Sequence, residues 1–493
     1  MTRPSSLLAA ALAAAALILM GAPLPAAAQE VTARGSLTGE YLYNLVEDGS
    51  VFDGRVELDA ETGPFLVGIV YRAYQLSDPD YNPALKDIPA SEIKHRFAEF
   101  HKDALSVRAG HFFSTFGKGL ALRSYEEIDL EHDTVLDGIL ASYDLGVASV
   151  TALSGIASED LSPSRERNHT VRGVEVTASP WEWASLGGRA VERSWEDDDE
   201  DVALPDSLAL FEDVVLSGQA ELWLGPVSVS AEYAGRSGEN PETGLESLQG
   251  HATYLSGTAD LGWATLFGEV KDYEDFAHRF VNPPTCVREH PWTLMNRATY
   301  EIDLDDERGF LAEGTVPIGE QVSLTGGASE ARDQNSDLAH WEMFGTVAYS
   351  IGESATGSFA ASRSREYLLG KFTEHVIGAA DLDVDFASGF SLGVVAEAGT
   401  TDDVTGIQYE DYIASVTWYP GGGVTVSHVF EATTSELETR TTWLMSEVKK
   451  SITDDLEVAL AAGAERGGKK CAGGVCYFEP EFEGVRLRLN AFF

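Results

Sequence analysis

The sequence closes with Gly484-Val485-Arg486-Leu487-Arg488-Leu489-Asn490-Ala491-Phe492-Phe493, in which every second residue is apolar. The apolar residues share one face of a strand, and Arg486, Arg488 and Asn490 share the other face. In a soluble sheet such a strand would be an edge with unpaired backbone groups. A closed barrel that is apolar outside and wet inside suits both faces. An ordinary amphipathic edge strand is the alternative interpretation.

The alternation continues through most of the chain. Residues 227–234, 392–398, 412–418 and 456–465 each alternate apolar with small or polar side chains. Short connections, such as Asp144-Leu145-Gly146, alternate with long polar ones, such as 77–92 and 470–481. Outer-membrane barrels alternate short periplasmic turns with long extracellular loops in this way. The sequence therefore predicts an all-β fold: a single large transmembrane antiparallel β-barrel of about 24 strands, with roughly 22 to 26 as the range, and lumenal loop segments.

The N-terminal residues predict export. Arg3 precedes an apolar run from Leu7 to Met20, and Ala26-Ala27-Ala28 follows after two prolines. This pattern predicts a secretory signal peptide over residues 1–28 and leaves residues 29–493 for the barrel. No later run reaches the length of a membrane-spanning helix. An exported protein without such a helix is secreted, periplasmic or an outer-membrane barrel.

The composition narrows the classes of partner. The chain has 80 acidic and 34 basic side chains and a formal net charge of -46. This charge argues against a nucleic-acid partner, because phosphate binding needs clustered lysine and arginine. Solvation of the protein, or adaptation to salt, is the favoured explanation of the strong acidity. Three cysteines are too few for a disulfide framework.

Counting strands from the two ends of the chain gives a conflict in strand direction between residues 263 and 304. Read from either end of the chain, the segments at residues 263–273 and 296–304 both run outward, so the chain must cross back between them. We predict that residues 274–294 lie inside the barrel, because three prolines disfavour a ladder strand and charged side chains are costly against lipid. We expect Arg288 and Glu289 to pair with lumen side chains. The candidate residues of this lumenal segment are His278, Arg279, Arg288, Glu289 and His290.

A second segment, residues 108–123, resembles a porin pattern in which a strand ending Gly-x-Phe is followed by an aromatic-Gly pair and a loop that folds into the lumen. The resemblance implies a pore constriction in which opposed charges select solutes by field and size. Lys118 and Arg123 would face acidic residues across it. A solvated extracellular loop is the alternative. The candidates are Lys118, Arg123, Glu126, Glu127, Asp129 and Glu131.

Two further resemblances concern the protein family. The segment that ends at Phe493 resembles the C-terminal strand of Gram-negative outer-membrane β-barrels, which ends in Phe and is read by the barrel assembly machinery. Residues 108–133, together with Asn282-Pro283-Pro284, Arg288-Glu289-His290 and Asn296-Arg297, resemble a large, functionally uncharacterised family of bacterial outer-membrane β-barrel, porin-like proteins. The resemblance covers most of the mature chain. It implies the outer membrane of a Gram-negative bacterium, with lipid and lipopolysaccharide around the barrel.

The sequence favours transport over catalysis. It contains no nucleophile elbow and no His-Glu-x-x-His. We therefore expect no enzymatic activity, no cofactor and no metal. A barrel of more than about 16 strands is wide enough for an aqueous lumen or a plug. The leading hypothesis is a porin-like channel for small hydrophilic solutes. The alternative is a barrel plugged by its own segments that acts as scaffold or partner for another cell-envelope protein.

The cysteines give a prediction. Cys471 and Cys476 lie in one long loop, and in an oxidising compartment they can close a small disulfide ring. A metal site is the alternative, with Cys286 and His290 as further ligands. We expect non-reducing mass mapping to join Cys471 to Cys476 and to leave Cys286 as a free thiol. A link from Cys286 to either of the other two would contradict this assignment.

Overall fold

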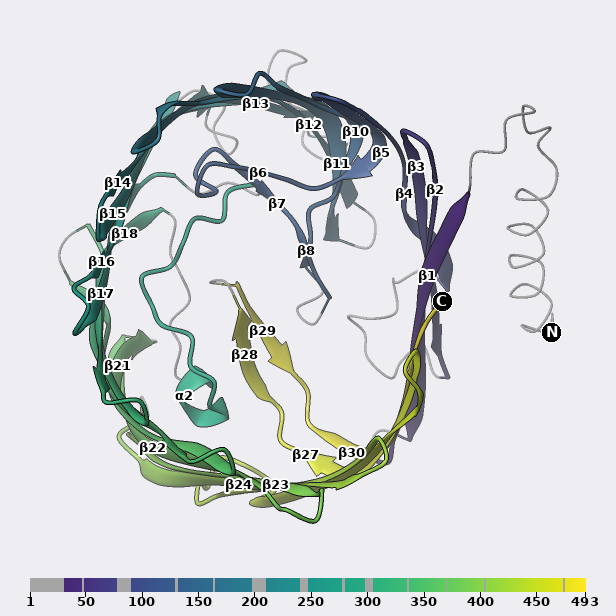
Figure 1. Ribbon diagram of the computed structural model, residues 1–493, viewed down its shortest axis with the longest axis vertical. Coiled ribbons are helices and arrows are strands. Elements are labelled where there is room, and N and C mark those ends of the chain that lie inside the picture. The colour runs from purple at the N-terminus through teal and green to yellow at the C-terminus, as the bar shows by residue number, and fades with distance from the viewer. Residues whose placement is uncertain are drawn as a thin grey trace.

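The structure is a computed structural model. It describes residues 31–493 apart from 47, 78–89, 129–131, 163–164, 197–209, 240–246, 277–279, 298–304, 335–336, 369, 403–404 and 473–474. The expected signal peptide lies outside the described residues. Viewed down its axis, the chain forms a ring of strands around a lumen, and several segments lie inside the ring (Figure 1).

The wall of the ring is one antiparallel sheet of 24 strands. Its first part contains β1 (Thr32–Asn44), β2 (Gly49–Thr62), β3 (Phe65–Leu76), β4 (Ser91–Lys102), β5 (Leu105–Phe112), β10 (Leu136–Asp144), β11 (Ala148–Ser162), β12 (Arg165–Trp181), β13 (Ala184–Glu196), β14 (Leu210–Leu224), β15 (Val227–Glu239), β16 (Ser247–Asp260) and β17 (Thr265–Glu274). Its second part contains β18 (Asp306–Ile318), β19 (Val322–Arg332), β20 (Leu338–Ile351), β21 (Ala355–Leu368), β22 (Lys371–Asp385), β23 (Ser391–Asp402), β24 (Gln408–Gly421), β25 (Val424–Thr433), β26 (Thr442–Thr453), β27 (Leu456–Glu465) and β30 (Phe482–Phe492). These bounds confirm the prediction of one large antiparallel barrel of about 24 strands.

The barrel closes where β1 pairs with β30. Gly35 donates its N–H to the carbonyl of Phe493 at 2.7 Å, and Phe493 donates back to the carbonyl of Gly35 at 3.0 Å. A Cβ at position 35 would lie only 2.7 Å from the Phe493 ring, so the absence of a side chain lets the ring lie over this position. The segment with which the sequence analysis began is therefore a closing strand and has no free edge.

The two faces of the wall differ in polarity as the alternation predicts. Along β30, Val485 and Leu487 are 41% and 44% exposed, and their cross-strand partners on β1 are Tyr43 and Tyr41. Residues of the same face stay exposed and apolar around the ring, among them Leu216 and Phe359. An apolar outer belt of this kind matches the hydrocarbon of a bilayer.

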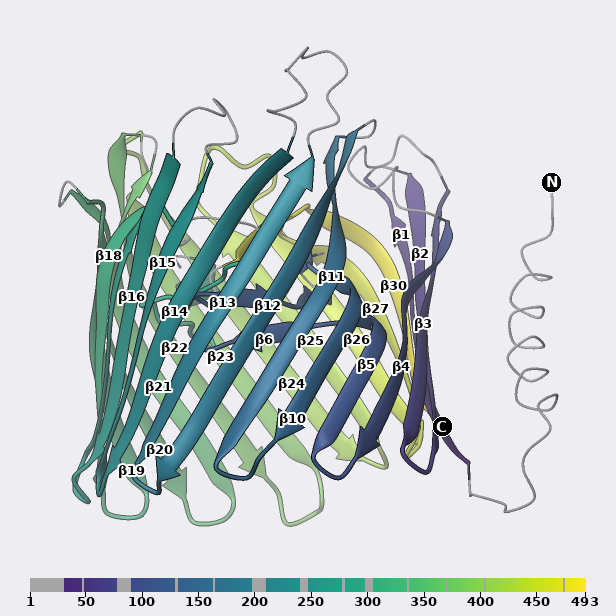
Figure 2. The same cartoon turned by 90° about the horizontal axis from the view of Figure 1, so that it is seen from above.

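The connections differ at the two ends of the barrel. At the inner rim, by which we mean the lower end in Figure 2, tight turns join neighbouring strands. Only Gly225 and Pro226 separate β14 from β15, and Gly225 has φ +65°, which glycine adopts without steric cost. The longer connections lie at the opposite end, which we call the outer rim. Among the residues that the structure describes, none of the helices is long or apolar enough to cross a membrane.

The predicted second outward strand at residues 296–304 is wrong. Residues 293–297 belong to helix α2 (Thr293–Arg297), and residues 298–304 lie outside the described part of the chain. Strand β17 pairs directly with β18 in antiparallel register, from Thr265↔Thr315 to Glu274↔Asp306. The stretch 275–305 therefore leaves and returns at the outer rim, and no extra crossing is needed. The prediction of lumenal loop segments is confirmed, because part of this stretch and α2 lie inside the ring (Figure 1).

The face assignment can be tested with two neighbouring residues on β15. Val229 lies on the same face as Tyr233, which is 57% exposed, so Val229→Arg places a charge against lipid and should cost about 2–4 kcal/mol. Ser230 points to the other face, where its hydroxyl lies 3.3 Å from the Glu221 carboxylate. Ser230→Arg should therefore be tolerated. Heat-modifiable electrophoretic mobility measures folding, and equal behaviour of the two variants would contradict the assignment.

Candidate functional site

Three stretches of chain turn from the outer rim into the lumen (Figure 1). The first lumenal segment, residues 113–135, contains β6 (Ser114–Phe116), β7 (Leu122–Ser124), β8 (Glu126–Glu127) and β9 (His132–Asp133). The second lumenal segment, residues 275–305, contains α2. The third lumenal segment, residues 466–481, contains the hairpin of β28 (Gly468–Ala472) and β29 (Val475–Glu479). Together they occupy the space where a channel or a binding site would lie.

An apolar layer joins the first two segments to the wall. Phe116 and Phe280 are fully buried in one cluster with inward side chains of β12 to β14, including Val191 and Val215. A Cβ at Gly173 of β12 would lie 2.8 Å from the Phe116 ring, so a glycine here leaves room for that ring. Burial of one such phenylalanine is worth about 1.5–3 kcal/mol. This side of the lumen is consequently dry and packed like a protein core.

The first and second segments also bind each other. Arg123 donates its backbone N–H to the carbonyl of Phe280 at 2.7 Å and a guanidinium N–H to the carbonyl of Asn282 at 3.1 Å. Asn282 donates its side-chain amide to the Tyr125 hydroxyl at 2.5 Å, and the Arg123 guanidinium lies over the Tyr125 ring. The two segments therefore form one unit inside the barrel.

Wall carboxylates hold the tip of the first segment. The backbone N–H of Lys118 donates to Glu232 at 2.6 Å, and that of Gly117 donates to Glu175 at 3.1 Å. The Lys118 ammonium lies 3.1 Å from Glu221. Hydrogen bonds between a carboxylate and backbone N–H groups are stronger than neutral ones. The tip is thus fixed by three acidic side chains of β12, β14 and β15.

Glycine is required at this tip. Gly117 has φ +61°, and a Cβ there would lie 2.5 Å from the Glu232 carboxylate. Glu232 is only 1% exposed, accepts a hydrogen bond from Ser217 at 2.9 Å and lies 3.7 Å from Arg189. Simple alternation places Glu232 on a wet lumen face, where Glu232→Gln would be nearly neutral for folding. In the structure the Glu232 carboxylate lies out of solvent and accepts the backbone N–H of Lys118, so it anchors the first segment.

The β8–β9 hairpin is pinned to a different part of the wall. Arg55 of β2 donates two hydrogen bonds to Glu126, both at 2.8 Å. Lys94 of β4 lies 2.8 Å from Asp133, and His95 lies 3.4 Å from it. Burial alone would raise the pKa of Asp133, but hydrogen bonds from His95 and Lys94 hold this pKa well below its usual range. Asp133 therefore stays charged and keeps the hairpin on the wall.

His95, Glu126 and Asp133 also form a group with the donor types of a metal site. Their ligand atoms lie within 4.8 Å of one another. However, Arg55 and Lys94 already neutralise the two carboxylates at hydrogen-bond distance. A cation at this position would have to compete with two fixed positive charges, which disfavours a metal. The ion pairs account for the group as an anchor.

The second segment follows the inner wall from β12 to β23. Phe280 lies against His169 of β12, with ring centroids 5.7 Å apart. Further on, Arg288 pairs with Glu313 of β18, and His290 lies 2.8 Å from Glu342 of β20. Between these contacts Cys286 is 1% exposed, and burial raises the pKa of its thiol to about 12. The thiol is therefore neutral.

Helix α2 is held at both ends by glutamates of the wall. Glu397 of β23 accepts the backbone N–H groups of Thr293 and Leu294 at 3.0 and 2.7 Å. At the other end Arg297 donates to both oxygens of Glu431 of β25, at 2.5 and 3.1 Å. The apolar side of the helix packs on the wall, in a cluster of Trp292, Leu294, Met295, Ala360, Ile377, Ala379 and Ile413.

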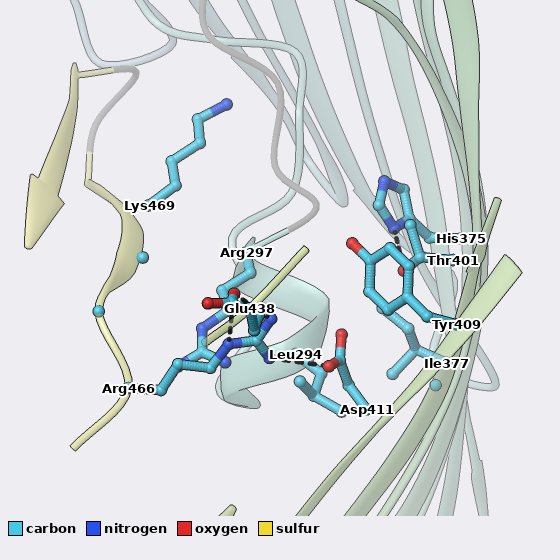
Figure 3. A pocket seen from close by; sticks show the side chains of 13 residues that line it. Leu294, Arg297, His375, Ile377, Thr401, Tyr409, Asp411, Glu438, Arg466 and Lys469 are labelled. Carbon is cyan, nitrogen blue, oxygen red and sulfur yellow. Dashed lines mark hydrogen bonds and ion pairs between the residues drawn. The ribbon is translucent and has the colours of Figure 1, made fainter. Parts of the chain in front are cut away.

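A cavity of about 260 Å³ lies between α2, the start of the third segment and the wall strands β22 to β24 (Figure 3). Leu294 and Ile377 contribute its apolar surface, and charged and polar side chains make up most of the rest (Figure 3). The most connected of these is Arg466, which lies 2.7 Å from Asp411, 3.2 Å from Glu431 and 3.0 Å from Glu438.

The inward face elsewhere in the barrel is polar, and part of it is open to solvent. Near the inner rim Ser142 bonds Thr151 and Thr315 bonds Thr325 across neighbouring strands. Arg34 and Asp59, which pair at 3.4 Å, have side chains 66% and 34% exposed. Partly exposed inward charges continue along β26, β27 and β30, with Lys449, Glu457 and Arg488. The lumen thus has a dry, covered side and a wet side.

Most contacts of the predicted site residues are with side chains of the barrel wall, and few are with one another. Lys118 is paired with Glu221 and Arg123 with Asn282, whereas Glu126 is paired with Arg55. Glu127 is half-buried on β8. Arg288 and His290 have partners on the wall, and Glu289 is exposed on the same segment. Asp129, Glu131, His278 and Arg279 lie outside the described residues.

The sequence reasoning missed the residues that hold these segments. Besides Arg55, Lys94 and His95, they are single inward acidic residues on otherwise small or polar strand faces, namely Glu175, Glu221, Glu232, Glu313, Glu342, Glu397 and Glu431. Their only signal in the sequence is their position within the alternation. Nothing in the local sequence distinguishes them from solvated acidic residues of a wet lumen.

The predicted cysteine pair lies in the lumenal hairpin. Cys471 and Cys476 are directly opposite each other in the β28–β29 register. Opposed residues of an antiparallel pair have Cα atoms about 4.5–5.5 Å apart, which is within the range of a disulfide. Their side chains lie outside what the structure describes, so the bridge stays a prediction.

Known proteins share this fold at low identity. A chain of the E. coli P pilus tip assembly intermediate PapC-PapD-PapK-PapG matches with TM-score 0.54 and 10% identity over 96% of this chain and 62% of that chain. The siderophore receptor PirA from Pseudomonas aeruginosa matches with TM-score 0.49 and 9% identity over 94% of this chain and 81% of that chain. At such identity the pilus match shows the fold alone, that of a large outer-membrane barrel.

The family is shown by sequence. No curated protein matches the chain. Residues 54–329, which are more than half of the chain, match a family that is described only as a family of unknown function, DUF6029. The expected resemblance to a functionally uncharacterised family of outer-membrane barrels is thereby confirmed. The chain belongs to the DUF6029 family.

Proposed function

We propose that the protein is a porin-like channel of the Gram-negative outer membrane for small hydrophilic solutes, and that its own lumenal segments narrow the lumen. The observation that carries this proposal is the division of the inward face. The first two segments cover the inward face along β12 to β23, whereas charged side chains near the seam between β1 and β30 stay solvent-exposed. We call the first two lumenal segments, residues 113–135 and 275–305, the partition. A solvent-exposed strip of wall beside a fixed partition is what a selective aqueous path requires.

The contacts support a fixed partition. The described anchors join the segments to many wall strands, from Arg55 on β2 to Glu431 on β25. Several of these pairs are largely buried, such as His290 with Glu342, whose side chains are 2% and 5% exposed. Removing one partner of a buried pair leaves an uncompensated charge and is strongly destabilising. The partition therefore acts as part of the wall and does not move freely in the lumen.

The same contacts favour a second candidate function. If the partition also closes the solvent-exposed strip, the barrel is plugged and serves as scaffold or partner for another cell-envelope protein. The extent of the apolar layer around Phe116 and Phe280 favours this candidate, because a channel needs less buried surface inside. The two functions differ in one measurable quantity, which is the ion conductance of the folded barrel.

Planar-bilayer recording of the purified, folded protein separates the two functions. A porin-like channel gives discrete steps of open-channel current that recur from one insertion to the next. A correctly folded barrel that inserts and stays silent would contradict the channel and support the partner role. Folding is checked on the same sample by heat-modifiable mobility.

The partition itself gives a prediction. Replacing residues 281–290 with ten alternating Gly and Ser residues keeps the length of the second lumenal segment between its contacts with β12 and β20. The exchange removes the side-chain contacts of Cys286, Arg288 and His290. The barrel should still fold, because the exchange leaves all 24 wall strands intact and lets water reach Glu313 and Glu342, so that neither stays buried without its partner. The single-channel conductance should rise, because the partition loses its side chains and its anchors.

The matched control is Arg308→Ala. Arg308 pairs with Asp272 at 3.1 Å, and both side chains are about half exposed, on the face opposite to Lys271. This variant loses an ion pair of the wall without touching the partition, so its conductance should equal that of the unaltered protein. An exchange of 281–290 that folds with unchanged conductance would show that this segment does not border the path.

A further inference from the structure

The cavity beside α2 has the form of a binding site for a small solute. It has a volume of about 260 Å³, which is close to the lower end of the range of about 300–1,000 Å³ for pockets that hold drug-sized ligands. Figure 3 shows side chains from three directions around it: His375, Thr401 and Tyr409 from the wall, Leu294 and Arg297 from α2, and Arg466 and Lys469 from the third segment.

Arg466 is positioned before any solute arrives. One end of its guanidinium, Nη1, lies 2.7 Å from Asp411 and 3.2 Å from Glu431, which are wall residues. Its plane lies against the Trp443 ring, with the guanidinium carbon 5.3 Å from the ring centroid. The Arg466 side chain is only 12% exposed. Both the position and the orientation of this guanidinium are therefore fixed by the barrel.

The opposite edge of the same guanidinium is less well satisfied. Nε and Nη2 of Arg466 both donate to a single oxygen of Glu438, at 3.3 and 3.0 Å. Glu438 lies on the connection between β25 and β26, and its side chain is 39% exposed. A carboxylate that presents both oxygens to this edge makes two parallel hydrogen bonds, which is the stronger arrangement. A free carboxylate can therefore make a stronger pair of hydrogen bonds to the Nε and Nη2 edge of Arg466 than Glu438 makes.

The rest of the lining brings hydroxyl groups and side chains of both charges, with Asp411 and Glu438 beside the three cations. Thr401 and Tyr409 bring hydroxyls, and His375 bonds Thr401 through its Nδ1 at 3.1 Å. Lys469 adds an ammonium group, which lies 3.7 Å from Glu366. In a chain with only 34 basic residues, three of them, Arg297, Arg466 and Lys469, meet at this cavity.

We propose that this cavity binds a small hydroxylated carboxylate of the sugar-acid class. The carboxylate of the solute displaces Glu438 and takes the Nε and Nη2 edge of Arg466 as a bidentate partner. Its hydroxyl groups meet Thr401, Tyr409 and Lys469. This proposal does not depend on whether the barrel conducts ions, because binding requires only that the solute can reach the cavity from solvent.

The test is calorimetric titration of the full-length folded barrel in detergent with D-gluconate, with D-glucose as the uncharged comparison. Glu438→Gln removes the competing carboxylate, so gluconate should bind about two- to fivefold more tightly, as expected when one part-exposed ion pair worth up to about 1 kcal/mol no longer competes. Glu436→Gln is the matched control. It makes the same charge change on the same connection, but Glu436 is exposed and does not line the cavity.

The outcomes separate clearly. Binding of gluconate but not glucose, tightened by Glu438→Gln and unchanged by Glu436→Gln, supports the site. Equal tightening by both variants means that a general charge effect is at work and overturns it. Failure of gluconate to bind either the unaltered protein or the Glu438→Gln variant overturns it as well, whatever conductance the barrel shows. Equal heats for glucose and gluconate would assign the cavity to neutral sugars and would remove the role given to Arg466.

Discussion

Backbone pairing inside the membrane is the constraint on which the whole structure depends. No water is present in hydrocarbon to satisfy an unpaired N–H or C=O, so a sheet must close on itself. Here 24 strands close through the contact of β1 with β30. A cylinder of so many strands encloses far more space than its own inward side chains can fill. The width of the lumen is therefore a consequence of the wall, and the lumenal segments are a response to that width.

The same constraint reappears inside the barrel. The lumenal segments contain little regular secondary structure, so their backbone N–H groups need acceptors from elsewhere. Wall glutamates supply several of them: Glu175 and Glu232 for the first segment, and Glu397 for the start of α2. Arg189, which lies 2.6 Å from Glu175, offsets the cost of burying these charges. Part of the acidity of this chain is thus structural and is directed inward.

The sequence predicted the wall well because the signal for a strand is local. Alternation along 227–234 or 484–493 depends only on neighbouring residues. The interior was predicted less well, because its contacts join residues far apart in the chain. Lys118 and Glu232 are 114 positions apart, and Arg123 and Asn282 are 159 apart. The error at residues 296–304 has a related cause: a segment that packs against the inside of a wall has apolar and polar sides too, and its sequence does not say whether lipid or protein covers the apolar side.

The seam between β1 and β30 also sets an order of events during folding. Gly35 and Phe493 lie far apart in the sequence, and their pairing completes the ring. The lumenal segments turn in from the outer rim, and an open, curved sheet gives them a wider approach than the finished cylinder does. Docking of the interior is therefore easiest before the last strand meets the first. Contacts of such long sequence separation form slowly, which gives the three lumenal segments time to find their partners while the sheet is still open.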